Sequence, residues 1–183
     1  MRNKKIVITG GPGSGKTVII NELEKRGYHV KHEIVRVLYK EGINKGVNNA
    51  FKDDPLEFSK KLLDYRINQF DSSSDLKYNS CKPYVFFDRG LHDIFAYLNF
   101  IKKNHDYKNI IFSYPYDFVF LFNPWKKIYI KDDERMESFE DSRRLFEHIK
   151  LIYNEAKIKT KIILNDSVEN RVDYIINHLD NIQ

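Results

Sequence analysis

The glycine-rich segment at residues 10–17 constrains the fold of this chain more than any other feature. It reads Gly-Gly-Pro-Gly-Ser-Gly-Lys-Thr, which fits the phosphate-binding loop (P-loop) pattern ending in Gly15, Lys16 and Thr17. Glycine has no Cβ, so such a loop can curl and direct consecutive backbone N–H groups toward an anion. Lys16 can reach the terminal phosphates of a nucleotide, and the Thr17 hydroxyl can bind Mg²⁺. The segment therefore predicts binding of a nucleoside triphosphate, with ATP and Mg²⁺ as the expected cofactors.

The residues on either side of this loop fit the same prediction. Residues 4–9 form an apolar run typical of a short buried strand, and residues 18–23 begin a helical pattern. A loop between a strand and a helix N-terminus places bound phosphate at the positive end of the helix dipole. An ordinary glycine-rich turn is the alternative, which the lysine, the threonine and this context disfavour. The residues expected to contact the nucleotide are Gly10, Gly11, Pro12, Gly13, Ser14, Gly15, Lys16, Thr17 and Val18.

Strand-like and helix-like segments alternate along the rest of the chain. Apolar runs predict strands at residues 4–9, 28–32, 83–87, 116–122 and 161–164. Helical spacing predicts the helices 18–26, 33–39, 54–70, 91–101, 145–156 and 168–179, and residues 41–53 read as a loop. This alternation predicts an α/β fold, with a five-stranded parallel sheet and helices on both faces. No linker or repeat divides the chain, so we expect one domain over residues 1–183.

The composition favours a soluble protein of the cell interior. The single cysteine, Cys81, excludes an internal disulfide, and the apolar run near the N-terminus is too short for a signal peptide or a membrane span. The net charge of +5 would suit either phosphate-rich ligands or nucleic acid. Because the lysines are scattered rather than gathered in one stripe, no nucleic-acid partner is expected. The expected localisation is cytoplasmic, and the oligomeric state is left open.

Asp88 is the next candidate site residue. It ends the apolar strand 83–87, so it lies at the edge of the predicted sheet where ligands bind in open α/β folds. A P-loop protein needs a carboxylate there, either to hold Mg²⁺ or to accept a proton from an attacking hydroxyl. Arg89 follows directly and could hold a substrate anion. The alternative is that Asp88 caps the helix that begins near Leu91, and the two roles are compatible.

Glu33 and Arg36 lie just beyond the second predicted strand, on the same edge of the sheet as the loop. Their spacing of three places them on one helix face, where they can pair. One interpretation makes them the acceptor side of the site, with Glu33 as the base and Arg36 as a clamp on the acceptor. The other is an ordinary surface ion pair, which is common in proteins.

Residues 126–144 are strongly charged and have little apolar periodicity. A segment that closes over a site can deliver arginine to a phosphoryl group during its transfer, and the planar guanidinium binds phosphate through two hydrogen bonds. The stretch therefore predicts a lid in which Arg135, Arg143 and Arg144 are candidate catalytic residues. The alternative is a solvent-exposed helix with charges of alternating sign.

Several of these motifs together resemble a known family. Gly10 to Thr17, Glu33-Ile34-Val35-Arg36 and Phe87-Asp88-Arg89-Gly90-Leu91-His92-Asp93 resemble the AAA-type ATP-binding domains grouped with the ribosylnicotinamide kinase domain of the bifunctional NAD-biosynthesis regulator. Asn123-Pro124-Trp125, residues 132–135 and the closing Ser167 to Val172 are similar to that group as well. The resemblance implies a nucleotide-kinase-like fold with ATP and Mg²⁺ at the loop and a lid around residues 135–144. It leaves the acceptor open, because some members of the group have an undefined acceptor and others are regulators.

The leading hypothesis is a small-molecule kinase that moves the γ-phosphoryl group of ATP to a nucleoside- or nucleotide-like acceptor. Thr17 and Asp88 would organise Mg²⁺, and Asp88 or Glu33 would take the proton. The expected catalytic residues are Lys16, Asp88, Glu33, Arg135, Arg143 and Arg144. The expected acceptor-binding residues are Glu33, Arg36 and Arg89. The alternative is a nucleotide-dependent ATPase or GTPase switch that acts on a protein or lipid partner.

Overall fold

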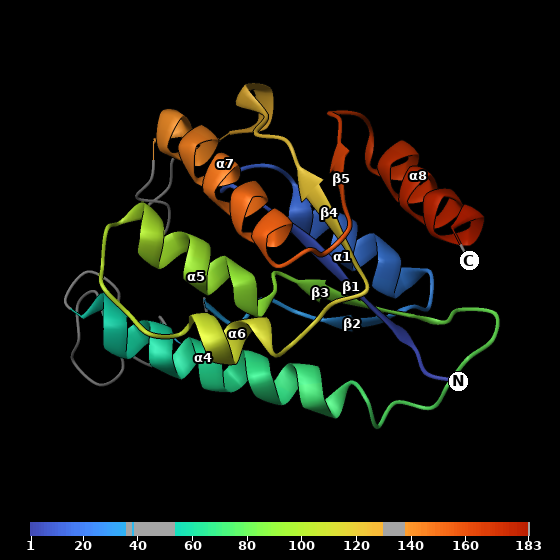
Figure 1. Cartoon of the computed structure of the whole chain (residues 1–183). Coiled ribbons are helices and arrows are strands. Elements are labelled where there is room, and N and C mark those ends of the chain that lie inside the picture. Colours follow the sequence, from blue (N-terminus) through green and yellow to red (C-terminus); the bar gives the residue numbers. More distant parts are fainter. Residues whose placement is uncertain (36–37, 39–53, 130–137, 183) are drawn as a thin grey trace.

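Five parallel strands form one sheet through the centre of the molecule (Figure 1). The computed structural model describes residues 1–35, 38, 54–129 and 138–182. Within these ranges the strand order is β2-β3-β1-β4-β5, and every neighbouring pair is parallel. The strands are β1 (Lys4–Gly10), β2 (His29–Lys31), β3 (Tyr84–Asp88), β4 (Phe118–Phe122) and β5 (Thr160–Ile163). The predicted five-stranded parallel sheet is thus confirmed.

Helices cover both faces of this sheet, also as predicted (Figure 1). One face carries α1 (Lys16–Lys25) and α8 (Val168–Asn181). The other carries α4 (Pro55–Ser72), α5 (Leu91–Phe100), α6 (Lys108–Phe112) and α7 (Phe139–Glu155). A short 3₁₀ helix, η1 (Lys126–Ile128), follows β4. No helix in the described ranges is both long and apolar enough to cross a membrane.

The two faces of the sheet have separate cores because side chains alternate along a strand. On β1, Ile6 and Ile8 pack with α1 and α8, whereas Val7 packs on the face of α4, α5 and α7. All of these side chains are fully buried. The same burial on both faces explains why β3 and β4 read as continuous apolar runs in the sequence. The carboxyl ends of β1 and β3 therefore meet at one edge of a rigid layer.

Several helix ends carry residues that favour a helix boundary. Asp54 accepts hydrogen bonds from the backbone N–H groups at the start of α4, with Pro55 as the first helical residue. Ser167 caps α8 by accepting from the Asn170 N–H at 3.1 Å. Gly27 follows α1 with a φ of 83°, the left-handed conformation that favours glycine.

Other local predictions are wrong. Helix α7 begins at Phe139 rather than near Leu145, because Ser138 and Asp141 form a reciprocal capping box ahead of the apolar pattern. Residues 139–144 of the predicted lid are therefore the first turns of this helix. Helix α6 was not predicted at all.

Candidate active site

The P-loop connects β1 to α1 at the carboxyl edge of the sheet, and other elements pack closely against it. A Cβ on Gly11 would lie 2.3 Å from Ser142 Oγ and 2.5 Å from the Ser142 carbonyl oxygen, so only glycine fits this approach of α7. Gly15 adopts a φ of 81° as the N-cap of α1. The predicted loop geometry, between a strand and a helix N-terminus, is therefore present.

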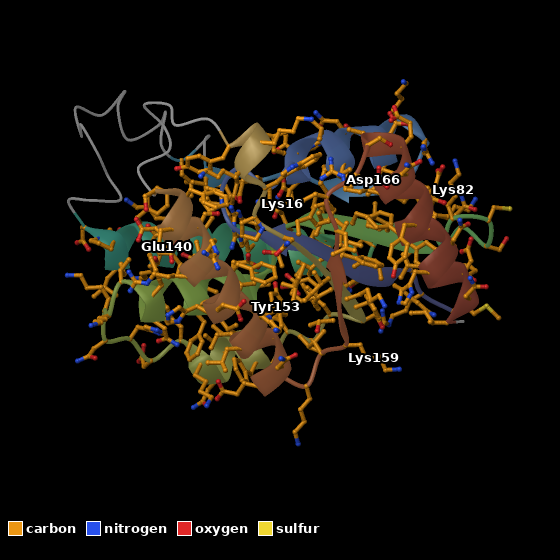
Figure 2. All side chains as sticks on the ribbon, turned by 90° about the horizontal axis from the view of Figure 1, so that it is seen from above. Lys16, Lys82, Glu140, Tyr153, Lys159 and Asp166 are labelled. Carbon is orange, nitrogen blue, oxygen red and sulfur yellow. The ribbon has the colours of Figure 1, made fainter. Side chains whose placement is uncertain are left out.

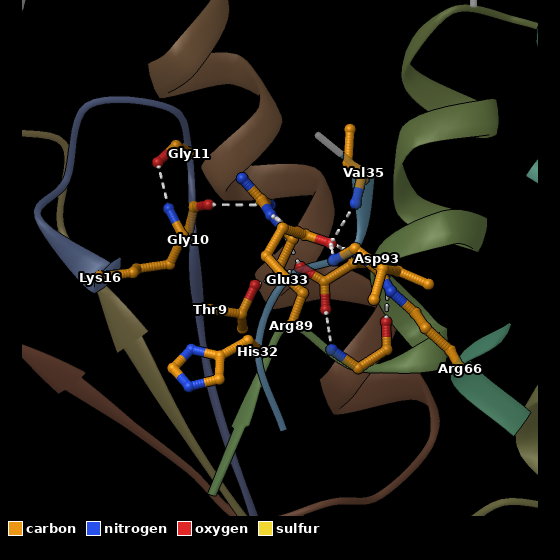
Figure 3. Close-up of polar contacts among 12 residues, drawn as sticks. Thr9, Gly10, Gly11, Lys16, His32, Glu33, Val35, Arg66, Arg89 and Asp93 are labelled. Atoms are coloured by element: carbon orange, nitrogen blue, oxygen red, sulfur yellow. Dashed lines mark hydrogen bonds and ion pairs between the residues drawn. The ribbon is translucent and has the colours of Figure 1, made fainter. Parts of the chain in front are cut away.

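Lys16 lies within this loop (Figures 2 and 3). Its ammonium group donates hydrogen bonds to the Gly11 carbonyl oxygen at 2.8 Å and to Ser14 Oγ at 3.0 Å. Burial, with the nearby Arg89 guanidinium, lowers the pKa of Lys16 to about 7. A phosphate group in the loop would supply the opposite charge that favours the ammonium form. Thr17 and Val18 follow on the first turn of α1, and both are exposed.

Helices α7 and α8 each form a hydrogen bond to the loop, and neither contact was predicted from the sequence. From α7, Ser142 Oγ donates to the Pro12 carbonyl oxygen at 2.8 Å. From α8, the Arg171 guanidinium donates to the Ser14 carbonyl oxygen at 3.4 Å and lies 5.5 Å from the centre of the Trp125 ring. Seen from above, Lys16 lies between Glu140 at the start of α7 and Asp166 just before α8 (Figure 2). The loop is therefore supported from both faces of the sheet.

Asp88 ends β3 and is only 4% exposed. Burial and the nearby Glu33 carboxylate raise its pKa. The next residue, Arg89, has a φ of 70°, which is uncommon for a residue with a side chain. The carboxylate that accepts a hydrogen bond at the start of α5 is that of Asp93, from the Gly90 N–H at 2.9 Å. The capping role considered for Asp88 therefore falls to Asp93.

Glu33, just after β2, lies between two guanidinium groups (Figure 3). Arg66 Nη2 is 3.1 Å and 3.2 Å from its two carboxylate oxygens, and Arg89 Nε is 2.8 Å from Oε2. Arg89 Nη1 also donates to the Gly10 carbonyl oxygen at 3.2 Å. Arg89 thus connects the Glu33 carboxylate directly to the P-loop. Arg36, the predicted partner of Glu33, lies outside the described residues.

Arg66 is the main site residue that the sequence interpretation missed. It belongs to α4 and is 3% exposed, and its Nη1 donates to the Gly90 carbonyl oxygen at 2.8 Å. The available signal was its position on the apolar face of that helix, beside Leu62 and Leu63. An arginine is almost never fully buried unless it is paired, so an arginine at such a position indicates a buried carboxylate partner.

The structure places two of the three predicted lid arginines, both on α7. Arg143 pairs with Glu140 at 3.4 Å and Arg144 with Asp141 at 3.7 Å, and both arginine side chains are largely exposed. Arg135 lies outside the described residues. Their proposed role at a transferring phosphoryl group stays a prediction.

The residues predicted to hold Mg²⁺ have suitable chemistry. The Thr17 hydroxyl and the Asp88 carboxylate are oxygen ligands at the carboxyl edge of the sheet, and Mg²⁺ prefers oxygen. Within the part of the chain that the structure describes, no group of three or more His, Cys, Asp or Glu side chains is placed to hold a metal ion. Mg²⁺ usually takes one or two protein carboxylates and completes its shell with phosphate oxygens and water, so its binding by Thr17 and Asp88 stays a prediction.

Known structures share this fold. The chain is similar to the deoxyadenosine kinase of M. mycoides solved with bound dCTP, with a TM-score of 0.69, 19% identity and coverage of 97% of this chain and 99% of the other. It is also similar to the thymidylate kinase of Ehrlichia chaffeensis, with a TM-score of 0.63, 15% identity and coverage of 98% and 100%. No curated protein sequence matches the chain.

A comparison of the sequence with protein-family models shows which family the chain belongs to. The family model described as an AAA domain matches residues 5–171, which span the P-loop, Asp88 and Arg171. The finer resemblance to the ribosylnicotinamide kinase domain stays a prediction. Because the match covers nearly the whole sequence, this chain belongs to the AAA domain family, and it has the fold of nucleoside and nucleotide kinases.

Proposed function

We propose that this protein is a kinase that transfers the γ-phosphoryl group of ATP to a hydroxyl or phosphate of a nucleoside- or nucleotide-like acceptor. The observation that carries the proposal is the bridge made by Arg89, which binds both the Gly10 carbonyl oxygen of the P-loop and the Glu33 carboxylate. A protein that only bound a nucleotide would need the loop alone. The bridge links a carboxylate to the loop that would hold the phosphates, and a carboxylate in that position can receive a proton from an acceptor.

The reaction follows from this arrangement. With a hydroxyl acceptor, the acceptor oxygen attacks the γ-phosphorus and forms the new P–O bond, while the bond from that phosphorus to the β,γ-bridging oxygen breaks and ADP leaves. The acceptor proton passes to the carboxylate of Glu33, whose side chain is 18% exposed and pairs with Arg66 and Arg89. Arg89 and Lys16 stabilise the charge that develops on the transferred group.

Other residues prepare the site for this step. The N–H groups of the loop and the N-terminus of α1 hold the triphosphate. When bound at Thr17 and Asp88, Mg²⁺ would neutralise phosphate charge. Arg66 pairs with the Glu33 carboxylate at 3.1 Å and would hold it in place. Most of the rate enhancement in such a site comes from positioning and electrostatics.

The structural relatives support the proposed class of acceptor. One is named a deoxyadenosine kinase and another a thymidylate kinase. One name points to a nucleoside acceptor and the other to a nucleotide acceptor, so a test must include both.

The experiment uses the purified protein, ATP labelled at the γ-phosphate, Mg²⁺, and a panel of nucleosides and nucleoside monophosphates. We expect label to appear in a phosphorylated acceptor, and only when that acceptor is present. Release of labelled phosphate at a rate that no acceptor changes would contradict the kinase and favour the nucleotide-dependent switch.

A further inference from the structure

The buried carboxylate of Asp93 gathers polar groups from three elements around the turn that carries Arg89. It accepts hydrogen bonds from Thr9 Oγ1 on β1, from the Gly90 N–H at 2.9 Å and from the Tyr153 hydroxyl of α7 at 2.6 Å. It also pairs with Arg89 Nη1 at 3.5 Å. Burial opposes its ionisation, but nearby guanidinium groups and these hydrogen bonds hold the pKa of Asp93 below its usual value.

The turn itself is closely packed by neighbouring side chains. A Cβ on Gly90 would lie 2.5 Å from the Tyr153 hydroxyl and 2.9 Å from the Tyr116 ring. The Leu91 N–H donates to the Tyr116 hydroxyl at 3.3 Å. Tyr153 and Tyr116 are both at least 95% buried, so the groups that hold the turn are themselves fixed. The turn is therefore shaped by α5, α7 and the segment before β4 rather than by its own sequence.

Arg89 needs such support. Its φ of 70° is a conformation that a Cβ disfavours, so the surrounding structure must hold it there. Glu33 contacts Nε of the Arg89 guanidinium at 2.8 Å, and Asp93 contacts its Nη1 at 3.5 Å. If Glu33 becomes neutral on taking a proton, Asp93 is the described carboxylate contact that still anchors Arg89.

We propose that Asp93 and Tyr153 are positioning residues, which hold Arg89 in the orientation that phosphoryl transfer requires. This inference rests on the proposed kinase function. Tyr153 acts through Asp93, and Asp93 acts through Arg89. Helix α7 also contacts the P-loop through Ser142. The same helix would therefore position both the loop that binds phosphate and, through Asp93, the guanidinium of Arg89.

The test begins with Tyr153→Phe, which removes the hydroxyl and keeps the ring. We expect kcat to fall roughly tenfold while the Kd for ATP changes less than about twofold, because a small misplacement of a catalytic group lowers the rate far more than it weakens binding. When Tyr153→Phe is added to the Arg89→Lys variant, kcat should fall no further. The matched control is Tyr84→Phe, which removes another buried tyrosine hydroxyl bonded to a carboxylate, Asp180 at 3.1 Å, on the opposite face of the sheet.

A loss of kcat that is equally large in the Arg89→Lys background would overturn the proposal, because Tyr153 would then not act through Arg89. A second readout needs no activity: the NMR signal of the Arg89 Nε–H group, assigned by its absence in Arg89→Lys. We expect this signal to shift in Tyr153→Phe and not in Tyr84→Phe, and an unchanged signal overturns the proposal. If the wild-type protein phosphorylates no acceptor, the kinase function fails while the NMR result still decides the positioning role. Should Tyr153→Phe not fold, Thr9→Val removes a different hydrogen bond to Asp93 and carries the same expectations.

Discussion

Arg89 Nε lies 2.8 Å from Oε2 of Glu33, and this contact joins the end of β3 to the residues that follow β2. The same guanidinium reaches the Gly10 carbonyl oxygen at 3.2 Å. A ligand phosphate in the loop and an acceptor beside Glu33 would therefore share one arginine. Under the proposed function, this shared arginine would couple the nucleotide-binding loop to the acceptor that receives the phosphoryl group.

Replacement of the P-loop lysine should abolish transfer without unfolding the protein. Lys16→Met removes the ammonium group that reaches the phosphates, so we expect more than a hundredfold loss of kcat/KM, on the order of the roughly 3 kcal/mol that such electrostatic contacts contribute. Thermal unfolding should be little changed, because a buried cation is replaced by an apolar chain of similar length. Lys25→Met, on the exposed last turn of the same helix, should keep full activity.

The left-handed backbone at Arg89 should be visible in stability measurements. Arg89→Gly and Arg89→Ala remove the same ion pairs, but only glycine relieves the strain of a φ of 70°. We expect the glycine variant to be more stable by about 1 kcal/mol in urea unfolding, and both to be inactive.

The control for this comparison is Lys157, an exposed residue outside the site with a φ of 56°. Lys157→Gly and Lys157→Ala should differ in stability by a similar amount while both remain active. Equal stability of the two Arg89 variants, with a difference at Lys157, would show that the turn carries no strain.

The close packing of α7 on the loop predicts that Gly11→Ala weakens ATP binding at least tenfold, because the new Cβ would lie 2.3 Å from Ser142 Oγ. Ser142→Ala should not restore binding in the double variant, since the Ser142 carbonyl oxygen would still lie 2.5 Å from that Cβ. Isothermal titration calorimetry measures the Kd for ATP in the single variant and in the double variant. Recovery of wild-type affinity in the double variant would mean that the hydroxyl alone limits the space.

His92 makes stability depend on pH. It is fully buried, neither ring nitrogen has a hydrogen-bond partner among the described residues, and burial lowers its pKa to about 4. Between about pH 6.5 and pH 4 the unfolded chain binds a proton that the folded protein does not, so the free energy of unfolding should fall as pH drops through this window. The slope is about 1.4 kcal/mol per pH unit, or roughly 3 kcal/mol in total.

Urea unfolding of His92→Leu across the same pH range checks this prediction. We expect the variant to lose that part of the pH dependence, because leucine does not titrate. The exposed His29 provides a matched control, and His29→Leu should keep the slope of the wild type. A wild-type slope in His92→Leu would assign the pH dependence to other groups.

The sequence was sufficient for the sheet and the P-loop for physical reasons. Strands buried on both faces need apolar side chains along their length, as β4 has throughout and β3 has up to Asp88, and a loop that surrounds phosphate needs glycine at fixed spacing. Helix α6, by contrast, is only five residues long and has no room for a periodic pattern. The early start of α7 was readable from the Ser138–Asp141 capping box, which the charged composition of the segment obscured.

The partners of the site residues were harder to predict. Arg66 of α4 contacts Glu33, and Tyr153 of α7 contacts Asp93. The members of each pair are far apart in the sequence, so the local pattern does not indicate which side chains will be partners. Arg66 did carry a signal, since a cation on an apolar helix face needs a carboxylate. The sequence contained no comparable signal for the Tyr153 hydroxyl, because a tyrosine on an apolar helix face is usually an ordinary core residue.

The most direct test of the account is the rate of acceptor-dependent phosphoryl transfer by Glu33→Gln, measured beside Glu24→Gln. Glu24 is an exposed glutamate on α1 that pairs with His32, so its replacement controls for the chemical change alone. We expect Glu33→Gln to lose at least a hundredfold in kcat with little change in ATP affinity, since the amide cannot accept the acceptor proton, and Glu24→Gln to match the wild type. Wild-type kcat in Glu33→Gln would contradict the assignment of Glu33 as the base.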